Sequence, residues 1–176
     1  MAFAATLAAS ATFALVPLQT ALVSLPFVVV LSVLSAIDIR SHLLPDTLTL
    51  PLLLSGLLVS TLGFGPPILS SATGAALGWG SFAAIAYVYR VIRGFDGLGL
   101  GDAKLLGAIG AWCGVLVLPM VVFAASAFAL LFYIAARIKK KSADRYGEIP
   151  FGPFLALAGW FCMILTRTEL DMLSVL

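Results

Sequence analysis

The distribution of charge along the chain is the feature that most constrains its fold. Long apolar stretches carry no charged residue, and the charged residues fall in the short segments between them. Only 10% of the residues are charged and 62% are hydrophobic, whereas about a quarter of a soluble domain is charged. Too little polar surface remains to face water, so we expect an integral membrane protein. The net charge of +2 is too small to indicate a nucleic-acid partner.

Apolar stretches long enough to cross a bilayer define the expected architecture. A spanning helix needs about 20 apolar residues, and six stretches approach this length: 18–37, 48–64, 71–89, 104–118, 119–136 and 151–166. The sequence therefore predicts an all-α fold, a polytopic membrane helical bundle of about six spans, in one membrane-embedded domain that covers residues 1–176.

Residues 1–17 leave two alternatives open. The segment is apolar but short for a span, and Pro17 and Pro26 interrupt the pattern that would extend it. An interfacial or half-buried helix and a seventh span both fit. It lacks the basic start of a signal peptide, so we expect it to stay in the mature chain.

The uncharged stretch 105–136 is too long for one crossing. As a single helix it would measure about 48 Å, against a hydrocarbon thickness of about 30 Å. We therefore predict two short spans that turn near Gly114 and Pro119. With six spans, nearly all Lys and Arg residues fall on one face and only Arg167 lies opposite. The positive-inside rule makes that face cytoplasmic.

Two aspartates at predicted span ends are the candidate chemical groups. Asp38 closes the first span and Asp102 opens the fourth, with two spans between them. An even number of crossings returns the chain to the same face, so we expect both carboxylates at one end of the bundle. Ionisable groups at a membrane boundary favour a functional interpretation. The structural alternative is that each acid is an ordinary interfacial or capping residue.

The residues around these acids suggest how each is held. Gly99 and Gly101 precede Asp102, and glycine permits the close approach of another segment. Asp102 is also expected at the start of a helix, where the positive end of the helix dipole stabilises a negative charge. Asp46 precedes the second span and is expected to cap it. His42, the only histidine, is expected to be a polar loop residue.

No metal site or disulfide is expected. Cys113 and Cys162 lie in separate apolar stretches with no second cysteine nearby, which provides too few ligands for zinc. The small residues at Gly74, Gly78 and Gly80, and at Gly110 and Gly114, are expected to pack the protein's own helices together.

Three ordered motifs carry a resemblance to a known family. They are Asp38 with Leu44-Pro45-Asp46, the segment Gly99-Leu100-Gly101-Asp102-Ala103-Lys104, and the proline-rich segment 149–159. Together they resemble the type IV prepilin peptidases, the bacterial branch of the GxGD membrane aspartyl proteases. The likeness covers roughly residues 30 to 165.

The resemblance implies a peptidase that removes the basic leader of type IV prepilins or of type II secretion pseudopilins. It implies a cut after a glycine at the cytoplasmic face of the bacterial inner membrane, and it requires no metal and no cofactor. The family's catalytic aspartates correspond to Asp38 and Asp102. Two close carboxylates share one proton, and the sequence leaves open which of them is the base. The residues expected to bind substrate or shape the site are Gly99, Gly101, Lys104, Pro45, Pro150, Gly152 and Pro153.

Further expectations concern one lysine, a second activity and the partners. Lys104 is expected to orient Asp102 or to contact phospholipid. Many members carry an N-terminal region with two Cys-x-x-Cys pairs that is associated with methylation by S-adenosylmethionine. This sequence contains no such pairs, so we expect a short, peptidase-only form. The expected partners are prepilins or pseudopilins and the lipid bilayer. The sequence specifies neither a particular pilin nor an oligomeric state.

Two alternative functions stay open. One is a related GxGD protease that acts on preflagellins or other membrane substrates, although the Leu-Pro-Asp and Pro-Phe-Gly-Pro-Phe segments argue against it. The other is a small transporter or scaffold that buries two acids for ion binding. Broken helices and an internal repeat would favour the transporter, and neither is clear in the sequence.

Overall fold

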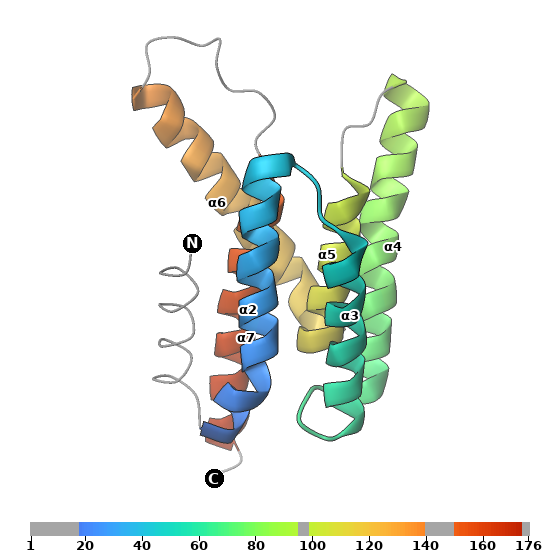
Figure 1. The fold of residues 1–176 in the computed structure, drawn as a ribbon, viewed down its shortest axis with the longest axis vertical. Coiled ribbons are helices and arrows are strands. Elements are labelled where there is room, and N and C mark those ends of the chain that lie inside the picture. The colour runs from blue at the N-terminus through green and yellow to red at the C-terminus, as the bar shows by residue number, and fades with distance from the viewer. Residues whose placement is uncertain (1–17, 95–98, 140–149, 174–176) are drawn as a thin grey trace.

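The regular structure of the chain is helical throughout the residues that the computed structural model describes, which are 18–94, 99–139 and 150–173. The helices run alternately up and down, as Figure 1 shows. The prediction of an all-α helical bundle is confirmed, and the uncertain segment 1–17 lies outside the described residues. The elements are α2 (Leu18–Ser41), α3 (Asp46–Thr61), α4 (Ile68–Arg93), α5 (Leu100–Cys113), the 3-10 helix η1 (Val115–Val117), α6 (Leu118–Lys139) and α7 (Gly152–Leu173).

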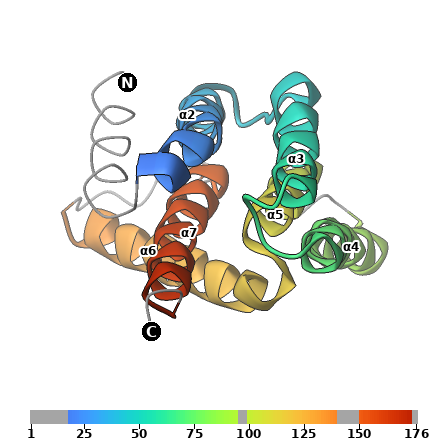
Figure 2. The ribbon, with the colours of Figure 1, turned by 90° about the horizontal axis from the view of Figure 1, so that it is seen from below.

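The helices form two groups that meet at α5. Helices α3 and α4 pack mainly on α5, whereas α2 and α6 pack on α7. Helix α5 also contacts α7 and so joins the groups, which lie side by side in Figure 2. The two candidate acids therefore belong to different groups, Asp38 to that of α2 and Asp102 to that of α5.

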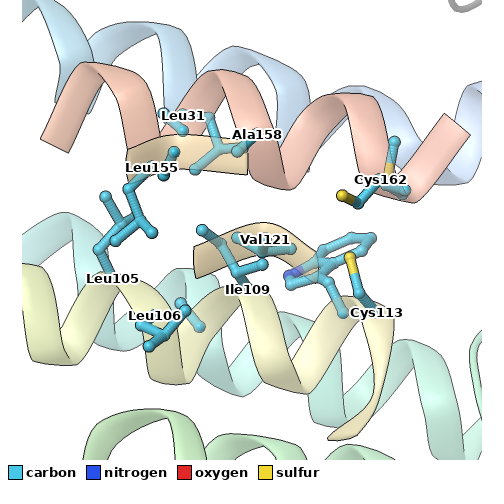
Figure 3. Packing of buried hydrophobic residues seen from close by; sticks show 14 of the residues in the cluster. Leu31, Leu105, Leu106, Ile109, Cys113, Val121, Leu155, Ala158 and Cys162 are labelled. Atoms are coloured by element: carbon cyan, nitrogen blue, oxygen red, sulfur yellow. The ribbon is translucent and has the colours of Figure 1, made fainter. Parts of the chain in front are cut away.

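Helix α5 is the centre of the core. Every residue from Leu105 to Cys113 is buried, which is the pattern of a helix enclosed on all sides. Figure 3 shows Leu105 and Ile109 beside Leu155 of α7 and Val121 of α6. The core therefore fixes the position of α5, and with it the first turn that carries Asp102.

The outer surface of the bundle is strongly apolar. Leu116 and Phe123 are 88% and 77% exposed, as suits side chains that face lipid. Three described segments are long and apolar enough to cross a membrane: Leu22–Ser41, Ile68–Arg93 and Val115–Ala135. The chain is thus a polytopic helical membrane protein.

The other apolar segments, α3, α5 and the apolar part Gly152–Thr166 of α7, are shorter than a full crossing. Helix α5 has 14 residues and a length of about 21 Å, below the hydrocarbon thickness of about 30 Å. Helix α3 has 16 residues. The predicted number of six spans therefore stays a prediction.

The predicted turn within 105–136 is confirmed. Helix α5 ends at Cys113, because Gly114 adopts a left-handed φ of 83° that a helix does not accept. Helix α6 then starts at Leu118 with Pro119 in its first turn, where proline removes no helical hydrogen bond. The start of α5 was predicted at residue 104 and lies instead at Leu100.

Close glycine packing joins α4 to α5. A Cβ atom on Gly74 or Gly110 would contact the backbone carbonyl of the other, and a Cβ on Gly78 would lie 2.7 Å from the Leu106 carbonyl oxygen. The prediction that these small residues pack the protein's own helices is confirmed. Gly80 differs from this expectation, because a Cβ there would meet nothing within 4 Å.

Candidate active site

Three helix ends converge on the two candidate acids. Asp38 lies in the last turn of α2, Asp102 in the first turn of α5, and Gly152 begins α7. These ends lie at the same end of the bundle, the upper one in Figure 1. The structure thus has both acids at one end, as the even number of intervening spans predicted.

Asp38 is held by the start of α7. The residue is only 5% exposed, and the backbone amide of Gly152 donates a hydrogen bond of 3.1 Å to Oδ2. The first amides of a helix have no partner within the helix, so this amide is available to a carboxylate. Pro153 follows in the first turn, where its missing amide costs no hydrogen bond.

The residues before α7 anchor this helix start. The Phe151 carbonyl oxygen accepts hydrogen bonds from the amides of Phe154 and Leu155, both at 3.1 Å. The Phe151 ring lies 6.4 Å from the ring of Phe82 on α4. Pro150 is half-buried immediately before this anchor. Because α4 belongs to the other helix group, the Phe82 contact ties the start of α7 to that group.

Asp102 lies in a different environment. It is partly buried in the first turn of α5, outside the three candidate spans, and its amide donates to the Gly99 carbonyl at 3.1 Å. Burial raises the pKa of Asp102 from its ordinary value to about 7, and the nearby charge of Asp38 adds to the rise. The charges of the two carboxylates therefore interact across the two helix groups.

One of the two glycines before Asp102 has a neighbouring segment against it. A Cβ atom on Gly101 would lie 2.9 Å from Cβ of Leu44, in the loop between α2 and α3. A Cβ atom on Gly99 would lie 3.6 Å from its nearest neighbour, Oδ2 of Asp102, which is an ordinary contact. The close approach expected from this motif thus occurs at Gly101 and not at Gly99.

Lys104 pairs with Asp46. Its Nζ atom lies 2.6 Å from Oδ1 of Asp46, and the side chains are 31% and 56% exposed. Lys104 therefore binds an acid other than Asp102, and its expected role toward Asp102 or phospholipid stays a prediction. Spacing in the sequence does not indicate this pair, because Asp46 and Lys104 lie 58 positions apart.

The prediction that Asp46 caps the second span is wrong. Asp46 is the first residue of α3, and Pro45 occupies the capping position. The Pro45 carbonyl accepts the amides of Leu48 and Thr49 at 3.1 and 3.2 Å. Pro45 therefore shapes the start of α3 through its backbone, and the Asp46 carboxylate is left to bind Lys104.

His42 directly follows α2 and lies in the loop, as predicted. It is exposed, has a left-handed φ of 52°, and its amide donates to the Asp38 carbonyl at 2.9 Å. Both cysteines of the chain lie among the described residues, where Cys113 ends α5, Cys162 is in α7 and neither forms a disulfide. Within the described ranges, no three His, Cys, Asp or Glu side chains come together.

A pair of carboxylates in unequal surroundings can carry out acid–base chemistry. The member that keeps its proton near neutral pH donates it, and the ionised member accepts one. Groups of this kind can hydrolyse an amide through an activated water without a metal ion.

Comparison with known proteins gives one consistent family. Residues 25–134, which contain both aspartates, match the Type IV leader peptidase family. Leader peptidase HopD of Escherichia coli is 42% identical over 142 residues, which cover 78% of this chain and 91% of that relative. No solved structure matches the chain.

Longer relatives match over part of their length. The prepilin leader peptidase/N-methyltransferase of Xanthomonas campestris pv. campestris is 42% identical, and the protein of the same name from Pseudomonas aeruginosa is 37% identical. The matches cover 72% and 78% of this chain but 44% and 49% of those relatives. The chain therefore spans less than half the length of these two proteins.

Proposed function

Because the chain belongs to the type IV leader peptidase family, we propose that it is a membrane aspartic endopeptidase that removes the basic leader of type IV prepilins or pseudopilins. The cut follows a glycine at the cytoplasmic face of the bacterial inner membrane, and residues 1–176 form one membrane-embedded domain. The observation that carries the proposal is that Asp38, at the end of α2, and Asp102, at the start of α5, lie at the same end of the bundle.

The proposed reaction is hydrolysis of one peptide bond. One carboxylate takes a proton from a water molecule, whose oxygen attacks the scissile carbonyl carbon, while the other carboxyl group donates its proton to the carbonyl oxygen. The carbon–nitrogen bond then breaks as the leaving nitrogen takes up a proton, and one proton is returned to the pair. The products are a carboxylic acid at the end of the leader and the free amine of the mature pilin.

The position of the acids suits a substrate with two unlike parts. A prepilin joins a basic leader to a hydrophobic helix, so its cleavage site lies where the polar and apolar parts meet. Asp38 and Asp102 lie at helix ends beside apolar segments, which supports a cleavage site at such a boundary. The excess of Lys and Arg on the same side of the six-span arrangement supports a cytoplasmic orientation.

The test is co-expression with a prepilin in a bacterial strain that lacks its own leader peptidase. Removal of the leader is read as an electrophoretic shift, and the mass of the mature N-terminal fragment locates the cut. We expect cleavage directly after the glycine, and no cleavage of a control prepilin in which a bulky residue replaces that glycine. A full-length prepilin in the presence of membrane-inserted protein contradicts the proposal.

A further inference from the structure

We propose that the backbone amide of Gly152 holds Asp38 as the ionised member of the carboxylate pair, so that Asp38 is the general base and Asp102 the general acid. In this assignment Gly152 is a positioning residue, since it acts through Asp38 and not on the substrate. The inference rests on the proposed function and adds to it the direction in which the proton moves.

The hydrogen bond itself distinguishes the two charge states of Asp38. An amide can only donate, and Oδ2 of Asp38 receives it at 3.1 Å in a buried position. A donor aimed at a carboxylate favours the ionised form, because the negative oxygen is the stronger acceptor. The amide also lies at the positive end of the α7 dipole, which acts in the same direction.

The absence of a side chain at Gly152 makes this contact possible. A Cβ atom there would lie 2.6 Å from Oδ2 of Asp38, which is too close for carbon, and 3.1 Å from Cγ, which is a tight contact. The φ of Gly152 does not require glycine, because it is not among the positive values. The requirement for glycine at this position is therefore the space occupied by the Asp38 carboxylate.

Asp102 has the opposite character. Among the described residues, no hydrogen-bond donor reaches its carboxylate. Burial, with a smaller contribution from Asp38, raises the pKa of Asp102 to about 7. Asp102 consequently retains a proton near neutral pH at a position where it can donate.

The other charged groups near the pair do not reverse this order. His42 lies one turn beyond Asp38 along the chain, and a positive charge there would also favour an ionised carboxylate. Lys104 on α5 is paired with Asp46. The described elements packed around Asp38 thus provide one donor amide, one histidine and the second acid, Asp102.

With these roles each proton has a defined path. Asp38 takes a proton from a water molecule while the water oxygen bonds to the scissile carbon. At the same time Asp102 gives its proton to the carbonyl oxygen of the substrate. Asp38 then passes its proton to the leaving nitrogen as the carbon–nitrogen bond breaks, and Asp102 recovers a proton from the hydroxyl of the intermediate. The pair ends with the protons it began with.

The first test measures the two charges directly and needs no substrate. The full chain, labelled with 13C at the aspartate carboxyl carbons and held in lipid nanodiscs, is titrated by NMR. D38N and D102N identify the two signals. We expect the Asp38 signal to report an ionised carboxylate at a pH where Asp102 is still protonated. The reverse order overturns the assignment.

The second test asks whether Gly152 sets this order. G152A should lower the kcat of leader cleavage by about 10- to 100-fold. The new methyl group would displace the Asp38 carboxylate, and small displacements of a catalytic group have effects of that order. It should also move the acidic limb of the pH–rate profile to higher pH by about one unit, because Asp38 loses its donor. The H42N variant keeps the Gly152 amide in place. It therefore measures separately how much the histidine contributes to the position of the acidic limb.

The matched control is G159A on the same helix. A Cβ atom at Gly159 would lie 2.8 Å from Cδ1 of Ile109, so α7 is crowded to a similar degree away from the acids. We expect the acidic limb of G159A to coincide with that of the wild type. A slowed G152A whose acidic limb does not move would show that Gly152 serves packing alone, and would overturn the proposal.

The two tests separate this inference from the proposed function. If the wild type cleaves prepilin while Asp102 ionises before Asp38, the peptidase stands and the role assignment is wrong. If the order of ionisation is as expected but no prepilin is cleaved, the proposed function fails and the effect of Gly152 on Asp38 remains.

Discussion

Lys104 Nζ lies 2.6 Å from Oδ1 of Asp46 and ties the start of α5 to the start of α3. Leu44 and Gly101 make a second contact between the same two regions. Asp102 lies in the sequence between Gly101 and Lys104, so the two contacts flank it. They restrain the turn of α5 that brings Asp102 toward Asp38.

Replacing Gly101 should disturb this turn. In G101A the new Cβ atom would lie 2.9 Å from Cβ of Leu44, so the loop or the start of α5 must move. We expect leader cleavage to fall about tenfold or more, because small displacements of a catalytic group have effects of this order. G80A is the matched control, since its Cβ would meet nothing within 4 Å. Equal cleavage rates for G101A and G80A would contradict this role of Gly101.

The ion pair should contribute much less than the glycine contact. Asp46 is 56% exposed, and exposed ion pairs stabilise proteins by about 0 to 1 kcal/mol. We therefore expect D46N to retain cleavage within about threefold of the wild type, with a small loss of thermal stability. Complete loss of cleavage in membrane-inserted D46N would show that Asp46 belongs to the catalytic machinery.

The pH dependence of cleavage should reflect the raised pKa of Asp102. Because that pKa is about 7, Asp102 is protonated below this pH and loses its proton as the pH rises through it. The proposed reaction needs that proton, so the rate should fall from about pH 7 toward pH 9. Measuring kcat/KM in vesicles across this interval checks the prediction. A rate that stays constant up to pH 9 would rule out Asp102 as a proton donor of this kind.

The orientation can be tested with single cysteines in a background that lacks Cys113 and Cys162. A cysteine at Ser41, an exposed position at the end of α2, should react with a polar thiol reagent only from the cytoplasmic side. One at Pro67, at the opposite end where α4 begins, should react only from outside. Labelling of position 41 from outside would invert the proposed topology.

The features that could be predicted from the sequence are those that follow from length and charge. The turn at Gly114 was predictable because 105–136 is too long for one crossing. The location of Asp38 and Asp102 at one end followed from the even number of spans between them. Neither argument needs the distance between two helices.

The features that could not be predicted depend on tertiary contact. Asp38 and Gly152 lie 114 positions apart, so spacing gave no indication of their hydrogen bond. The predicted start at residue 104 differs from the observed one because an apolar stretch need not begin where its helix begins. A helix can begin in polar sequence, and this one begins at Leu100. The capping role assigned to Asp46 failed for a related reason, since Pro45 already occupies the capping position.

The central claim is that Asp38 and Asp102 together hydrolyse the leader, and the most direct measurement is prepilin cleavage by D38N and D102N. Each variant removes one member of the shared-proton pair and leaves the apolar core unchanged. Each should therefore insert into the membrane at the wild-type level and yield no mature pilin. Mature pilin at a rate near that of the wild type, from either variant, would contradict the account.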